Sequence, residues 1–138
     1  MAKIIAVTNQ KGGVGKTTTC VNLSSCMAAL GKRILVVDID PQGNCTSGFG
    51  LKAQDDRSTY EALLDPDSAA DCIMKTCVDN LEIMPSGMQL AGAEIELIGM
   101  DGRESRLKRA LRQFDDRFDY IMIDSPPSLG ILTLNGLK

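Results

Sequence analysis

Short apolar runs separated by polar and glycine-containing segments predict buried strands. The runs cover residues 4–7, 34–37 and 120–123, and a fourth segment, residues 81–84, alternates like a short strand. Continuous apolar runs of this length are typical of strands that are covered on both faces, as in parallel sheets. The pattern therefore favours an α/β fold over an all-helical one.

Amphipathic segments between these runs predict helices. We expect helices at residues 16–30, 59–64, 90–98 and 103–114, and a loop at residues 41–57, which are rich in Gly, Asn, Ser, Thr and Asp. Strand, helix and strand follow one another within about 35 residues at the N-terminus, which makes a right-handed βαβ unit. The expected fold is a mostly parallel sheet flanked by helices, in a single domain over residues 1–138.

The charge is unevenly spread along the chain. The net charge is −3, yet residues 51–104 alone hold four basic and twelve acidic groups, a local charge of −8. This acidic middle makes general nucleic-acid binding by these residues unfavourable. Four arginines recur at steps of three in the last predicted helix: Arg103, Arg106, Arg109 and Arg112. Because acidic residues surround them, we expect a solvated helix surface there, with a DNA-binding patch as the alternative.

Missing residue types exclude several kinds of chemistry. The chain has no histidine, which excludes Ser-His-Asp and Cys-His catalysis and zinc sites built with histidine. Its five cysteines are odd in number and form no C-x-x-C pair, so we expect reduced, partly buried thiols. A signal peptide and an apolar window long enough for a membrane span are both absent from the sequence. The sequence therefore predicts a cytoplasmic protein without membrane contact.

A glycine-rich segment between the first strand and the first helix predicts a phosphate-binding loop. Its residues are Lys11, Gly12, Gly13, Val14, Gly15, Lys16, Thr17 and Thr18. Glycines let backbone N–H groups approach phosphate oxygens, and the positive end of the following helix dipole favours an anion there. Lys16 can reach the β- and γ-phosphates, and the Thr17 hydroxyl can ligate Mg²⁺. Gln10 stands where the general pattern has its first glycine.

Three carboxylates follow predicted strands and are expected at the same sheet edge as this loop. Asp38 and Asp40 end the second strand, and Asp124 ends the last. Ligands of open parallel sheets bind beyond the carboxyl ends of the strands, so these acids are candidates to hold Mg²⁺ or its waters. Without histidine, a carboxylate or amide must position the attacking water. Asp40 is the best candidate by position, and Gln42 and Asn44 are weaker ones.

These motifs resemble those of the ParA/Soj branch of the ParA/MinD-type ATPases. Residues 10–18 are similar to the deviant Walker A box, residues 38–44 to the second box of the partition branch, and residues 124–128 to its Walker B region. Residues 90–97 also look like a segment typical of Soj-like proteins. The similarity extends from residue 3 to residue 138, so it implies a P-loop NTPase-like fold for the whole chain.

The resemblance implies roles for matching residues. Lys11 would be the signature lysine that reaches the phosphates of a dimer partner, and a side chain at Gly12 would obstruct that dimer. Lys16 would be the loop lysine, and Thr17 the Mg²⁺ ligand. Asp40 would position the hydrolytic water. Asp124 would hold Mg²⁺ through water.

The resemblance also implies a function for the whole protein. The family hydrolyses ATP slowly, dimerises on ATP, binds DNA without sequence preference and responds to a ParB/Spo0J-like centromere-binding partner, in the cytoplasm at the nucleoid. Family members continue past residue 138, so we expect an N-terminal portion in which the C-terminal part of the fold is missing. Two alternatives stay open: a nucleotide-binding fragment without turnover, and a MinD-like positioning ATPase.

Overall fold

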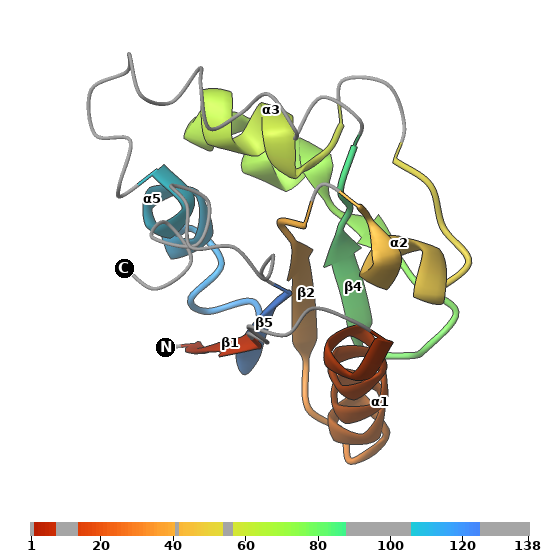
Figure 1. Ribbon diagram of the computed structural model, residues 1–138. Coiled ribbons are helices and arrows are strands. Elements are labelled where there is room, and N and C mark those ends of the chain that lie inside the picture. Colours follow the sequence, from red (N-terminus) through yellow and green to blue (C-terminus); the bar gives the residue numbers. More distant parts are fainter. Residues whose placement is uncertain (1, 8–13, 41, 54–56, 88–105, 125–138) are drawn as a thin grey trace.

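Helices cover both faces of a five-stranded sheet in this computed structural model (Figure 1). The structure describes residues 2–7, 14–40, 42–53, 57–87 and 106–124, and for residues 6 and 14–17 it describes only the backbone. The strands are β1 (Lys3–Val7), β2 (Ile34–Asp38), β3 (Met74–Lys75), β4 (Leu81–Met84) and β5 (Tyr120–Asp124). The helices are α1 (Val14–Ala29), α2 (Asn44–Gly48), α3 (Thr59–Leu64), the 3₁₀ helix η1 (Pro66–Cys72) and α5 (Arg106–Arg112).

The sheet is mostly parallel, as the sequence predicts. Its strand order is β1-β5-β2-β4-β3, and each pairing among β1, β5, β2 and β4 is parallel. The short β3 strand runs antiparallel to β4 and was not predicted, because two residues leave no periodic pattern. The carboxyl ends of the four parallel strands therefore meet at one edge of the sheet.

Alternate residues of the central strands β2, β4 and β5 enter two separate cores. The prediction of a buried strand at residues 4–7 is wrong in part, because β1 is an edge strand in which Ile4 and Ile5 are 44% and 36% exposed. In β2, Leu35 and Val37 pack with residues of α3 and α5 on one face of the sheet. Ile34 and Val36 pack with residues of α1 and α2 on the other face. Figure 1 shows these helices on opposite sides of the sheet. Since both faces are covered, the central strands are apolar throughout, which explains the continuous runs in the sequence.

Most predicted elements are confirmed, with shifted ends. Helix α1 begins at Val14, two residues before its predicted start, and α3 has the predicted bounds, with a capping box between Ser58 and Glu61. The predicted loop 41–57 is wrong in part, because α2 lies within it. Helix α5 confirms the central part of the helix predicted over residues 103–114. The predicted helix 90–98 lies outside the described residues.

Gly43 makes the turn before α2 possible. Its φ of 65° places it in the left-handed region, which glycine adopts without steric cost. Gly48, at the other end of α2, allows a close approach, because a Cβ there would lie 3.1 Å from a Val21 methyl carbon of α1. These two glycines let α2 turn back from β2 and lie against α1.

The arginine face of α5 is not uniformly solvated, in contrast to our expectation. The Arg106 Nη1 atom donates to the Leu63 and Leu64 carbonyls, at 2.9 and 2.8 Å. These carbonyls lie at the end of α3, where a cation is favoured by the helix dipole. Arg109 and Arg112 are exposed, as predicted for a solvated face, while Arg103 lies outside the described residues.

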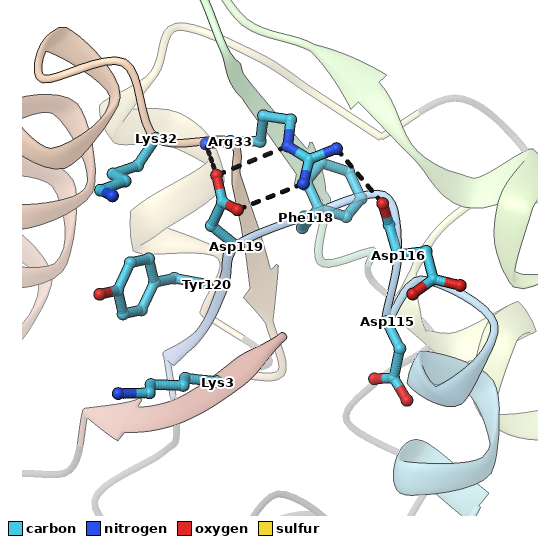
Figure 2. A pocket seen from close by; sticks show the side chains of 8 residues that line it. All are labelled: Lys3, Lys32, Arg33, Asp115, Asp116, Phe118, Asp119 and Tyr120. Atoms are coloured by element: carbon cyan, nitrogen blue, oxygen red, sulfur yellow. Dashed lines mark hydrogen bonds and ion pairs between the residues drawn. The ribbon is translucent and has the colours of Figure 1, made fainter. Parts of the chain in front are cut away.

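An ion pair joins the starts of β2 and β5 at the sheet edge opposite the carboxyl ends (Figure 2). The Arg33 guanidinium Nη2 lies 3.2 Å from the Asp119 Oδ1 atom, and the Arg33 backbone N–H donates to Oδ2 at 2.8 Å. The Asp119 N–H donates in return to the Arg33 carbonyl at 2.8 Å. The pair lines a surface cavity of about 300 Å³, to which Lys3, Lys32 and Tyr120 also contribute. None of the helices described here is long and apolar enough to cross a membrane.

Asp119→Asn should lower stability in a pH-dependent way. Hydrogen bonds from the Arg33 side chain and backbone hold the pKa of Asp119 below its usual value. The carboxylate therefore stabilises the fold above about pH 4, and this contribution fades as the pH falls through the lowered pKa. Denaturant unfolding of parent and variant between pH 3 and 7 should show a stability difference that shrinks at low pH. Asp79→Asn, at an exposed carboxylate before β4, is the control; a pH-independent difference for Asp119→Asn would contradict the assignment.

Leu111→Ala should destabilise the chain by about 2–5 kcal/mol, because it opens a cavity between α5 and the sheet. Leu111 is 1% exposed and Leu30, after α1, is 81% exposed. The same substitution at Leu30 should change the free energy of unfolding by less than about 0.5 kcal/mol. Urea denaturation measures both, and equal losses would contradict the described packing.

Candidate functional site

The predicted phosphate-binding segment leads from the end of β1 into α1. Of its residues, Val14 to Thr18 form the first turns of α1, and the Thr18 side chain is exposed. Lys11, Gly12 and Gly13 lie outside the described residues, as do the side chains of residues 14–17. The described backbone thus confirms that a helix of 16 residues starts within this segment, at the sheet edge where β2 and β5 end.

Asp38 and Asp124 are neighbours across the sheet. They are register partners at the carboxyl ends of β2 and β5, and both are 0% exposed. Asp38 follows Ile34 and Val36 at intervals of two, so it faces the side of the sheet that α1 and α2 cover. The structure therefore brings together two of the three acids that the sequence predicts at this edge, on the face of the sheet that α1 and α2 cover.

Hydrogen bonds from α2 and from the turn after β2 hold the Asp38 carboxylate. Its Oδ2 atom accepts from the Thr46 hydroxyl at 2.6 Å and from the Thr46 N–H at 2.9 Å. Its Oδ1 atom accepts from the Asp40 N–H at 3.2 Å. Burial raises the pKa of Asp38 to about 6 against these hydrogen bonds, and the nearby charge of Asp124 adds to the rise. A carboxylate with a raised pKa beside a second carboxylate is a suitable place for a cation.

Asp40 lies in a tight turn just beyond β2 and is 4% exposed. Its Oδ1 atom accepts from the Gln42 N–H at 3.0 Å, and its carbonyl accepts from the Gly43 N–H at 2.9 Å. The Ser86 hydroxyl donates to the same carbonyl at 2.7 Å. The backbone of the predicted water-positioning residue is thus fixed. The weaker candidates, Gln42 and Asn44, have exposed side chains.

Two residues of this edge were missed by sequence reasoning. Thr46 binds Asp38, and Ser86, two residues after β4, binds both Thr46 and Asp40. Thr46 lies in the segment interpreted as a loop, where a single threonine carries no signal. Ser86 lies two residues beyond the end of β4, just as Asp40 lies two residues beyond the end of β2. This position after a predicted strand was the available sequence signal for Ser86.

The donor set at this edge fits Mg²⁺. Carboxylate and hydroxyl oxygens are the ligands that a hard cation prefers, and Asp38 and Asp124 present two carboxylates side by side. Among the residues that the structure describes, no three Cys, Asp or Glu side chains lie close enough to hold a metal ion together. A bound Mg²⁺ would therefore need further oxygens, such as those of Thr17, phosphate or water.

Two buried thiols connect α1 with α2. The Cys45 thiol donates to the Cys20 sulfur at 3.8 Å, and both residues are 0% exposed. The contact with Cys20, burial, and the charges of Asp38 and Asp124 all raise the pKa of Cys45 far above its usual value. A thiol that stays protonated is a poor nucleophile, so this pair acts in packing. Three of the five cysteines, Cys20, Cys45 and Cys72, are buried, in agreement with the expected partial burial, and Cys26 and Cys77 are exposed.

Comparison with known proteins identifies the family. A family model described as an AAA domain matches residues 2–138. The chain belongs to this family. It is 59% identical over 138 residues to the sporulation initiation inhibitor protein Soj of Bacillus subtilis, covering 99% of the chain and 54% of that relative. It is 49% identical to the chromosome partitioning protein ParA of Myxococcus xanthus, covering 99% of the chain and 49% of ParA. The resemblance to the ParA/Soj partition ATPases is thereby confirmed.

A solved structure supports the same family assignment for this chain. The fold matches a Mycobacterium smegmatis protein, described as cobyrinic acid a,c-diamide synthase with bound ATP analog and magnesium, with a TM-score of 0.89 and 43% identity. That match covers 99% of this chain and 56% of the other. The P-loop ATPase-like fold is thus confirmed. The chain spans about half the length of the relatives that it matches.

A thiol reagent should distinguish the cysteines by their burial. Cys26 and Cys77 are exposed, while Cys20, Cys45 and Cys72 are buried. We expect Ellman's reagent to modify two thiols rapidly in the native chain and the other three only after denaturation. The double variant Cys26→Ser/Cys77→Ser should lose the fast phase. A fast phase that persists in this variant would contradict the described burial of Cys20, Cys45 and Cys72.

Proposed function

We propose that this chain supplies the nucleotide-binding and catalytic residues of a Mg²⁺-dependent ATPase of the ParA/Soj partition type. The observation that carries the proposal is the pairing of two buried carboxylates, Asp38 and Asp124, at the carboxyl ends of β2 and β5. They lie on the sheet face that is covered by α1, the helix that begins within the glycine-rich segment. A helix N-terminus attracts phosphate, and paired carboxylates attract the cation that accompanies it.

The glycine-rich segment has a proposed part in nucleotide binding. Gly12, Gly13, Val14 and Gly15 offer backbone N–H groups to phosphate oxygens, and Thr18 lies within the same first turns of α1. Lys16 neutralises charge on the β- and γ-phosphates, and Lys11 does so from a partner subunit of a dimer. The ATP analog bound to the similar M. smegmatis protein supports ATP as the ligand.

The acidic residues at the carboxyl ends of the strands have two proposed roles. Asp38 and Asp124, with Thr17, would hold Mg²⁺, which neutralises the phosphate charge when it is bound. Asp40 positions the attacking water, since its backbone is fixed by three hydrogen bonds and no histidine is available. Phosphoryl transfer depends mainly on positioning and charge neutralisation, so a weak base is sufficient.

The biological role is proposed for the whole protein. ATP would drive homodimerisation, and the dimer would bind DNA without sequence preference during chromosome or plasmid segregation. A ParB/Spo0J-like protein would stimulate hydrolysis at the nucleoid, in the cytoplasm and away from the membrane. The identity to Soj and to the chromosome partitioning protein ParA supports this role.

ATP hydrolysis tests the proposal, with Lys16→Ala as the decisive variant. We expect slow Mg²⁺-dependent turnover, stimulated by DNA together with a ParB-like protein, in this chain extended to the length of its relatives. Lys16→Ala should weaken ATP binding by about 100-fold or more, because the phosphates lose their principal cation. Phosphate release and fluorescent-nucleotide titration measure the two effects.

Lys32→Ala is the matched control for this test. Lys32 is exposed at the opposite edge of the sheet, beside the cavity of Figure 2, and its removal should leave binding unchanged. Retained ATP binding in Lys16→Ala would overturn the loop assignment. Binding without turnover in the extended protein would overturn the ATPase proposal. Turnover in the extended protein and none in these 138 residues would support the alternative of a nucleotide-binding fragment without turnover.

A further inference from the structure

Ser86 joins the loop after β4 to the turn after β2. Its hydroxyl donates to the Asp40 carbonyl at 2.7 Å, and its N–H donates to the Thr46 hydroxyl oxygen at 3.0 Å. Ser86 is 8% exposed, so water competes little for either hydrogen bond. One residue thus contacts both the turn of the proposed water-positioning residue and the helix that binds Asp38.

The hydrogen bonds around Thr46 have a fixed direction. The Thr46 hydroxyl donates its single hydrogen to Asp38 at 2.6 Å, so its lone pairs are left to accept from the Ser86 N–H. The Ser86 hydroxyl hydrogen is correspondingly free to be donated to Asp40. Hydrogen bonds are therefore donated from Ser86 to Thr46 and from Thr46 to Asp38. The reverse direction would leave a buried polar group without a hydrogen bond, which is costly.

Ser86 is itself held from the opposite face of the sheet. The Thr59 N–H donates to the Pro85 carbonyl at 2.8 Å, and the Thr59 hydroxyl lies within hydrogen-bond distance of the Met84 and Pro85 carbonyls, at 3.1 and 3.2 Å. Thr59 is the first residue of α3 and is 0% exposed. The backbone before Ser86 is therefore anchored to α3, independently of β2 and α2.

We propose that Ser86 is a positioning residue for ATP hydrolysis, which acts by holding the Asp40 carbonyl and thereby the place of the Asp40 carboxylate. The turn of Asp40 has local hydrogen bonds to Gln42 and Gly43, which move with the turn, and its Asp40 N–H donates to Asp38 at the end of β2. Ser86 instead ties the turn to β4 and α3. This inference rests on the proposed ATPase function.

The test compares turnover with nucleotide affinity in Ser86→Ala. A displacement of a reacting group by about 1 Å can cost two orders of magnitude in rate, so loss of one tether should lower kcat roughly 10-fold. ATP affinity should stay within about twofold, because Ser86 lies outside the phosphate-binding segment. Ser86→Thr keeps the hydroxyl and should retain kcat to within about threefold.

Ser68→Ala is the matched structural control. The Ser68 hydroxyl donates to the Asp65 carbonyl at 2.8 Å, the same type of hydrogen bond, at the start of η1. Both alanine variants should lower the denaturation midpoint, but only Ser86→Ala should lower kcat. If Ser86→Ala does not fold, Ser86→Cys, with its weak donor, replaces it with the same expectation.

The outcomes separate this inference from the function on which it rests. An unchanged kcat in Ser86→Ala, in a protein that hydrolyses ATP, would overturn the positioning role alone. An equal loss of kcat in Ser86→Thr would overturn it too, because the hydroxyl would then not be the cause. A parent protein without turnover would overturn the ATPase proposal, and the role of Ser86 with it.

Discussion

The buried carboxylate of Asp38 organises the edge of the sheet at which the candidate residues meet. Taking a carboxylate out of water is costly unless hydrogen bonds or opposite charges compensate it. Here Thr46 and the Asp40 N–H supply three hydrogen bonds, and they determine where α2 and the turn after β2 lie. The raised pKa of Asp38, near 6, indicates that this compensation is incomplete. The residual cost is the physical reason to expect a cation beside Asp38 and Asp124.

The parallel pairing of β2 and β5 brings motifs that are far apart in the sequence to one site. Asp38 and Asp124 are far apart in the chain, yet they become register partners because β2 and β5 are adjacent and run the same way. The antiparallel β3 strand lies at the far side of β4 and does not disturb this arrangement. The fold therefore needs only strand order and direction to bring the acids to the edge where α1 starts.

The sequence predicts this core well and its supporting contacts poorly, for physical reasons. Residues 34–37 and 120–123 are readable because strands covered on both faces must be apolar throughout. Helix α2 is not, because Asn, Thr, Ser and Gly have weak helix propensity, and α2 depends on tertiary contacts of Cys45 and Thr46. The role of Ser86 depends on strand adjacency, which a single serine after a proline cannot reveal.

The close approach of α2 to α1 has an evolutionary consequence. Gly48 faces a Val21 methyl group, and Cys45 contacts Cys20, so two positions on one helix each fit a specific partner on the other. A bulkier residue at either position fits only with a smaller one opposite, because packed interiors have little spare volume. Positions 20, 21, 45 and 48 should therefore vary in a correlated way among related chains, as a record of this shared helix interface.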